Sequence, residues 1–373
     1  MDIQSLFKEC GELGASDIHI WEGIPIMFRV EWKLIPSASG VLPGKILMFD
    51  FLYNLFYKKK EKISAFKNTM EADFWYICED QTSYRGNVFM YMGKIGIALR
   101  RIPDTIKNMI ELGIPTTIGK ALRSKQWLFL VTGPTGSGKS TTMASMIDAI
   151  NEFRTDHILT IEDPIEYIFE NKKSIISQRE VGRDTISFGA AIRAAMREDA
   201  NVIMIGEIRD AETMEVALSL AETGHFVIST LHTSGSVETI NRMLQFFPAG
   251  IEAQIRARIA SSLIGVISQR LIPLKNESGR VAIREIMYVT KKIKNLINKW
   301  DLLQIPNTIE TSSEEWMITM KKCANNLRDK WLVEEKSYSG YFVNNEYDLD
   351  WDDEVNNENN SQEEEIGTIS GLN

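Results

Sequence analysis

The stretch that most restricts how this chain can fold runs from Gly133 to Ser140 and reads GPTGSGKS. It matches the pattern G-x-x-x-x-G-K-[ST], in which backbone N–H groups of a glycine-rich loop surround the phosphates of a nucleotide. Residues 127–132 before it form a short apolar run that predicts a buried parallel strand. Residues 141–150 after it carry apolar side chains at helical spacing. We therefore predict a strand, a phosphate-binding loop and a helix in succession.

The residue types of this stretch suit a nucleoside triphosphate. The N-terminus of the following helix adds about half a positive charge. Lys139 is expected to reach the β- and γ-phosphates, and the Ser140 hydroxyl is expected to bind Mg²⁺. The alternative is a glycine-rich turn that matches the pattern by chance. The predicted phosphate-binding residues are Gly133, Pro134, Thr135, Gly136, Ser137, Gly138, Lys139, Ser140 and Thr141.

From about residue 116 the sequence alternates between strand and helix patterns, which is typical of a doubly wound parallel sheet. Three further short apolar runs, 158–161, 202–205 and 226–229, predict its other strands. Each is followed by polar residues: EDPIE, GEIRD and TLHT. Because ligands bind beyond the carboxyl ends of such strands, we expect these carboxylates and a histidine to lie near the glycine-rich loop. The alternative is that each polar residue only forms a turn or a helix cap.

Residues 1–100 predict a small α+β unit that precedes this sheet. We expect antiparallel pairing there because the connections are short. Pro103 and Pro115 bracket a predicted linker. The expected helices are 4–13 and 45–57, and the expected strands are 18–20, 27–30, 32–35, 74–77, 83–92 and 96–99.

The charge of the chain is distributed unevenly. The formal net charge of the 373 residues is −9, but ten acidic and no basic residues lie between Asn344 and Asn373. The rest carries 42 basic against 41 acidic residues, so the balance does not indicate nucleic-acid binding. We expect the acidic tail to be disordered.

The cysteines and the apolar runs bear on the compartment. Cys10, Cys78 and Cys323 form no C-x-x-C pair, which fits a reducing compartment and offers no zinc site. The N-terminus lacks a signal-peptide pattern, and no apolar run approaches the roughly 20 residues that span a bilayer. We expect a cytoplasmic protein without direct membrane insertion, and any membrane association would come through its partners.

The motifs together resemble those of the ATPases of pili and type II secretion. The start of the chain, SDIH at 16–19 with GIP at 23–25, resembles the twitching-motility (type IV pilus retraction) branch of that family. The similarity runs from about residue 3 to about residue 298. The other matching stretches are IEDPIEY at 161–167, QREV at 178–181, GEIRD at 206–210, AETGH at 221–225 and TLHT at 230–233.

The resemblance implies an α/β fold with two domains and a homo-hexameric ring. It implies a PAS-like N-terminal domain over residues 1–100 and a linker over 101–116. A RecA-like P-loop ATPase domain with C-terminal helices would follow over 117–335, and the acidic tail over 336–373. The implied function is an ATP-hydrolysing motor that depolymerises pilins. Its implied partners are the inner-membrane pilus platform protein and the pilin machinery.

The resemblance also implies roles for three residues beyond the P-loop. Glu207, in the Walker B position, would help Ser140 to hold Mg²⁺. Glu166 would position the attacking water, since a glutamate with a pKa of about 4.3 is a poor base; alternatively, it only starts a helix after Pro164. His232 would sense the γ-phosphate; alternatively, it is hydrogen-bonded within the fold.

Arg85 and Arg100 of the N-terminal unit resemble arginines that this family extends toward the γ-phosphate. The alternative is that both belong to a solvated strand face. If they bind the γ-phosphate, ATP ties the two domains together, and its hydrolysis releases them to rotate about the linker.

Features of the second half of the chain bear on the branch of the family. The extension and secretion branches carry a four-cysteine zinc motif that this chain lacks, which favours the retraction branch; residues 279–287 also resemble it. Lys294 and Asn298 replace two arginines of a later retraction motif. Beyond it, Trp300, Trp316 and Trp331 predict core aromatics of a packed helical end.

Two alternatives remain open from the sequence. One is an accessory, extension or secretion ATPase of the same family with low turnover of its own. The other is a DNA-translocating RecA-type ATPase, against which the near-neutral charge of residues 1–343 counts.

Overall fold

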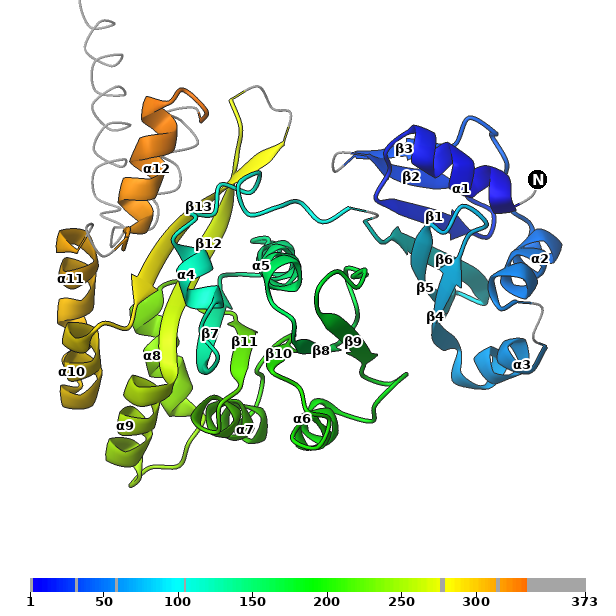
Figure 1. Ribbon diagram of the computed structural model, residues 1–373. Helices are drawn as coiled ribbons and strands as arrows, with labels where there is room; N and C mark the ends of the chain where they lie inside the picture. Colours follow the sequence, from blue (N-terminus) through cyan, green and yellow to red (C-terminus); the bar gives the residue numbers. More distant parts are fainter. Residues whose placement is uncertain are drawn as a thin grey trace, which may run out of the picture.

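The computed structural model describes residues 3–30, 33–57, 60–103, 105–275, 279–312 and 316–333. Two sheets organise these residues (Figure 1). The N-terminal sheet has the strand order β3-β2-β1-β6-β5-β4, and the second sheet has the order β13-β12-β7-β11-β10-β8-β9. The α/β class with a small N-terminal α+β unit is confirmed. The predicted acidic tail, 336–373, lies outside the described residues.

The N-terminal sheet is antiparallel throughout, as predicted. Helices α1 and α2 contribute apolar side chains such as Leu6 and Phe51 to its core. Helix α3 was not predicted, because its sequence KEKISAFKNT carries no apolar stripe. The elements are α1 (Ile3–Glu12), β1 (Asp17–Trp21), β2 (Met27–Val30), β3 (Lys33–Pro36), α2 (Lys45–Leu55), α3 (Lys60–Thr69), β4 (Glu71–Ile77), β5 (Ser83–Tyr91) and β6 (Lys94–Arg101).

The second sheet contains the four predicted parallel strands in the adjacent order β7-β11-β10-β8. Their bounds are β7 (Trp127–Thr132), β8 (His157–Glu162), β10 (Val202–Ile205) and β11 (Phe226–Leu231). Three flanking strands were not predicted: β9 (Ile175–Glu180), β12 (Leu263–Pro273) and β13 (Arg280–Tyr288). Strand β12 begins directly where α9 ends, so no loop signal marks its start. Strand β9 has polar residues in its second half.

Helices cover both faces of the second sheet. Leu128 and Leu130 of β7 pack into one core with α6 (Phe188–Ala195), α7 (Ala211–Glu222), α8 (Ser236–Gln245), α9 (Glu252–Ser262) and α10 (Lys291–Lys299). Phe129 and Val131 point the other way, toward α4 (Ile118–Leu122) and α5 (Lys139–Phe153). This alternation explains why β7 is apolar at nearly every position. The sheet is doubly wound, and its carboxyl edge is left open for a ligand.

The chain ends, within the described residues, in further helices (Figure 1). They are η1 (Leu302–Gln304), α11 (Ile305–Thr311) and α12 (Met320–Asp329). The prediction of core tryptophans was wrong for two of the three. Trp316 is 56% exposed and Trp331 is 77% exposed, whereas Trp300 packs against the main core. The rings of the two exposed residues lie under the cations of Lys120 and Lys275, respectively, which accounts for aromatic residues at a surface.

Membrane insertion has a simple structural criterion. Within the described ranges, no helix is long and apolar enough to cross a bilayer.

Candidate active site

The glycine-rich loop joins β7 to α5, as the sequence predicts, and its backbone requires glycine. Gly133, Gly136 and Gly138 have φ values of 144°, 77° and 85°. A Cβ at Gly133 would lie 2.2 Å from the backbone oxygen of Gln269. Helix α5 begins at Lys139, so its first N–H groups border the loop. The geometry is that of an anion-binding loop.

The loop lines a cavity of about 680 Å³ at the carboxyl edge of the sheet. The strand-end residues Glu166, Glu207 and His232 line the same cavity, so the expected convergence at this edge is found. Among the predicted phosphate-binding residues, Gly133, Pro134 and Ser137 do not line it. Those that do are Thr135, Gly136, Gly138, Lys139, Ser140 and Thr141.

Lys139 lies folded against the loop. Its Nζ donates to the carbonyl oxygens of Gly133, at 2.7 Å, and of Pro134, at 3.0 Å, and lies 3.4 Å from Nδ1 of His232. Burial lowers the pKa of Lys139, while the carboxylates of Glu207 and Glu166 act in the opposite direction. The lysine is thus partly desolvated and lies near the carboxylates of Glu207 and Glu166.

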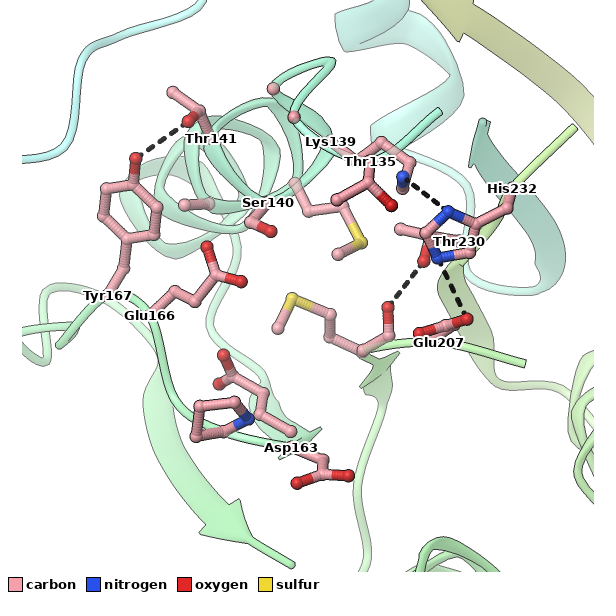
Figure 2. A pocket seen from close by; sticks show the side chains of 18 of the residues that line it. Thr135, Lys139, Ser140, Thr141, Asp163, Glu166, Tyr167, Glu207, Thr230 and His232 are labelled. Atoms are coloured by element: carbon pink, nitrogen blue, oxygen red, sulfur yellow. Dashed lines mark hydrogen bonds and ion pairs between the residues drawn. The ribbon is translucent and has the colours of Figure 1, made fainter. Parts of the chain in front are cut away.

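Glu207 and His232 are in direct contact. His232 Nε2 lies 3.0 Å from Glu207 Oε1. Figure 2 shows the two side chains at one end of the cavity, with Thr230 beside them. The other oxygen of Glu207 accepts a hydrogen bond from Arg209 Nε at 2.9 Å. Arg209 also lies 3.6 Å from Asp163, measured from Nη1 to Oδ2. The hydrogen-bonded alternative for His232 is therefore present in this state, alongside its place in the cavity.

Glu166 lies on a segment without regular secondary structure. Residues 165–170 form neither helix nor strand, so the alternative that Glu166 starts a helix is wrong. Figure 2 shows its carboxylate on the Ser140 side of the cavity, across from Glu207. Side chains fix the segment: the Tyr167 hydroxyl bonds the Thr141 hydroxyl at 2.8 Å, and Gln178 Nε2 donates to the Tyr167 carbonyl at 2.8 Å.

Among the lining residues that sequence reasoning did not assign to the site, two carry charge-bearing groups of interest, Glu162 and Arg280. Glu162, the last residue of β8, is 6% exposed, and burial raises the pKa of its carboxyl to about 7. It accepts hydrogen bonds from Thr160 Oγ1 at 2.7 Å and from Gln178 Nε2 at 3.3 Å. Nothing in the run EDPIE separates Glu162 from Glu166. The second residue, Arg280 of β13, also lines the cavity; its only sequence signal was the resemblance of residues 279–287 to the retraction branch.

One row of the N-terminal sheet faces the second sheet. Arg29, Asp17, Arg100, Arg85 and Trp75 are directly opposite one another on successive neighbouring strands, so they share a face. Arg100 Nε donates to Asp17 Oδ1 at 2.9 Å.

The two predicted arginines lie differently in this row. Arg100 lines the nucleotide-sized cavity. Arg85 does not; it lines an adjoining cavity of about 450 Å³, which shares Arg100, Glu166 and Tyr167 with the first. The structure therefore places Arg100 at the candidate site, whereas Arg85 lines only the adjoining cavity.

A doubly wound sheet, a glycine-rich loop at a helix start and carboxylates at neighbouring strand ends define the class of P-loop nucleotide-binding proteins. The match to the family model "Type II/IV secretion system protein" covers residues 2–278. The chain belongs to this family of secretion and pilus ATPases.

Two pilus ATPases of the family match this chain over most of their own length. The type IV pilus retractation ATPase PilT of Pseudomonas aeruginosa is 40% identical over 337 residues, covering 90% of this chain and 97% of the relative. The type IV pilus ATPase PilU of the same organism is 33% identical, covering 86% and 83%. A crystal structure of the pilus retraction motor PilT with bound ADP has a TM-score of 0.84 at 40% identity and covers 91% of this chain and 96% of that one.

Proposed function

We propose that this chain is an ATP-hydrolysing motor that retracts type IV pili by depolymerising pilin. The observation that carries the proposal is the convergence of Lys139, Glu166, Glu207 and His232 on one cavity. The chain is similar to a pilus retractation ATPase over nearly the whole length of that relative, which supports retraction rather than extension of the pilus.

In this proposal the loop residues bind the phosphates of ATP, and Lys139 leaves the loop carbonyls to reach the β- and γ-phosphates. Ser140 and Glu207 would hold Mg²⁺, which neutralises the charge of the phosphates. The donor set fits a hard cation that takes oxygen ligands. Within the described residues no group of three His, Cys, Asp or Glu could hold a metal ion. In this proposal, phosphate oxygens and water would supply the remaining ligands.

Glu166 orients the attacking water from the Ser140 side of the cavity. Positioning and electrostatics dominate phosphoryl transfer, so a carboxylate that orients the water can do this work without acting as a base. His232, in contact with Glu207, would sense the γ-phosphate from the opposite end of the cavity. Arg100 would contribute positive charge to the γ-phosphate. For Arg85 to contribute as well, the N-terminal sheet must move toward the cavity.

We propose that the segment 101–116 acts as the linker between the N-terminal domain, 1–100, and the ATPase domain, 117–335. Binding of ATP would hold Arg100 at the cavity, and loss of the γ-phosphate would release it. Six such chains in a ring would work on the pilus platform protein at the cytoplasmic side of the inner membrane. No part of this scheme uses nucleic acid.

The function is tested by deletion of the gene in its host, followed by scoring of surface pili. Retraction predicts an excess of pili and loss of twitching, both restored by the wild-type gene and not by a Lys139→Ala gene. Absence of pili after deletion would contradict retraction and indicate an extension motor.

An accessory role is the second candidate. A second type IV pilus ATPase, PilU, is also similar to this chain over most of its length, so similarity alone does not single out the retraction motor. It predicts little change in surface pili after deletion and little phosphate release by the purified chain. Rapid release of phosphate by the purified wild-type protein would exclude this candidate.

A further inference from the structure

Glu180, the last residue of β9, joins the N-terminal sheet to the segment that carries Glu166. Its carboxylate accepts a hydrogen bond from Trp75 Nε1, at 2.9 Å to Oε1 and 3.1 Å to Oε2. It also accepts the backbone N–H of Ile165, at 3.1 Å to Oε2. Glu180 is 8% exposed, so water cannot readily replace either donor. One buried carboxylate therefore accepts a hydrogen bond from the N-terminal sheet and another from the segment that carries Glu166.

The two donors to Glu180 connect the proposed catalytic segment with the arginine row of the N-terminal sheet. Ile165 directly precedes Glu166, so the bond to its N–H anchors the backbone next to the proposed water-positioning carboxylate. Trp75 lies on β4 directly opposite Arg85, at the end of the row that contains Arg100. The Arg183 guanidinium covers the Trp75 ring at 5.6 Å. Trp75 and the arginines of this row, Arg85 and Arg100, belong to the same sheet. If that sheet moves relative to the ATPase domain, the Trp75 indole therefore moves with the arginines.

We propose that Glu180 is a positioning residue that holds the Glu166 segment in place only while Trp75 is docked against it. When the N-terminal sheet rotates away, the buried carboxylate loses a charge-assisted donor and must recruit water. The Ile165–Glu166 backbone then loses its fixed anchor. Glu166 is in place when the arginine row faces the cavity, so hydrolysis is coupled to domain position. This coupling rests on the proposed ATPase function.

The test compares Trp75→Phe with Trp21→Phe in the full-length chain. Phenylalanine keeps a ring for Arg183 but removes the N–H donor at residue 75. Trp21, on β1 of the same sheet, packs on Tyr91. We expect Trp75→Phe to lower kcat by about tenfold, the rate ratio that corresponds to losing about 1.4 kcal/mol of a charge-assisted hydrogen bond. KM for ATP should stay unchanged because the loop is untouched. Trp21→Phe should behave as wild type.

Glu180→Gln gives an independent comparison. Its amide has one oxygen acceptor, and its NH₂ group would face one of the two donors. We expect the Trp75→Phe/Glu180→Gln double variant to have the kcat of Glu180→Gln alone, because both changes break the same connection. Strictly additive effects would contradict the proposal, as would a Trp75→Phe variant with wild-type kcat.

Amide hydrogen exchange tests whether Trp75 anchors the Glu166 segment, and it does so without measuring ATP hydrolysis. In the nucleotide-free full-length chain, Trp75→Phe should accelerate amide exchange in a peptide covering residues 161–169, and Trp21→Phe should not. Unchanged exchange in Trp75→Phe would overturn the proposal. If the wild-type protein released no phosphate, the proposed function would fail, while this exchange measurement would still decide whether Trp75 anchors the Glu166 segment.

Discussion

His232 Nε2 and Glu207 Oε1 lie 3.0 Å apart, on the ends of two neighbouring parallel strands. The contact places an imidazole beside a carboxylate proposed to hold Mg²⁺. It also joins the residues that follow β10 to those that follow β11. A displacement of Glu207 would therefore alter the position of His232. Lys139 Nζ, 3.4 Å from His232 Nδ1, extends the contact to the phosphate-binding loop.

The first prediction concerns this contact. His232→Ala leaves the backbone of the glycine-rich loop unchanged but removes one of the two partners of Glu207 at the proposed γ-phosphate end of the cavity. We expect kcat for ATP hydrolysis to fall by about 10²-fold, which is typical for one positioned group in an active site. ADP binding, measured by calorimetry, should change little. His225→Ala, at the other end of β11, serves as the control. Equal kcat in both variants would contradict the assigned role.

The second prediction concerns Arg100. Arg100→Ala should lower kcat by about 10²-fold or more, since arginines that contact the transferred phosphoryl group contribute about 10³–10⁵ where measured. Arg100→Lys should restore little, because lysine lacks the planar fork. Lys94→Ala, at the opposite end of β6, should be neutral. The measurement is steady-state phosphate release, and a fully active Arg100→Ala enzyme would place Arg100 outside the catalytic machinery.

Much of this architecture could be predicted from local patterns. The strand, loop and helix around Lys139 follow from glycine spacing and apolar periodicity, and the strand-end residues follow from the rule for parallel sheets. Strand β12 could not be predicted, because it begins at Leu263 directly after α9 ends at Ser262, with no turn residue between them. The row from Arg29 to Trp75 depends on the strand register of an antiparallel sheet. Register is a tertiary property, so the contact between Trp75 and Glu180, 105 positions apart, has no sequence signal.

The third prediction concerns Glu162 and pH. The pKa of its carboxyl is raised by burial from 4.5 to about 7, so between these values the folded state binds more protons than the unfolded state. The contribution of Glu162 to stability therefore falls as pH rises from about 4.5 to about 7, and then stays constant. Glu162→Gln removes the ionisation. The difference in unfolding free energy, variant minus wild type, should increase over this range in chemical denaturation without nucleotide. A pH-independent difference would contradict the assignment.

The fourth prediction concerns the loop backbone. Alanine at residue 133 would place its Cβ 2.2 Å from the Gln269 oxygen and would require a φ of 144°. We expect Gly133→Ala to abolish ADP binding and lower the melting temperature. Gly119→Ala in α4 meets no atom within 4 Å, so it should match or exceed wild-type stability. Normal nucleotide binding by Gly133→Ala would contradict the loop geometry.

The central claim is that this cavity hydrolyses ATP with Glu166 as the group that orients water. The most direct test measures ATP binding and phosphate release on the same preparations of wild type, Glu166→Gln and Lys139→Ala. We predict that the wild type binds and hydrolyses ATP, that Glu166→Gln binds ATP but turns over about 10²-fold or more slowly, and that Lys139→Ala binds poorly. Wild-type turnover by Glu166→Gln would contradict the account.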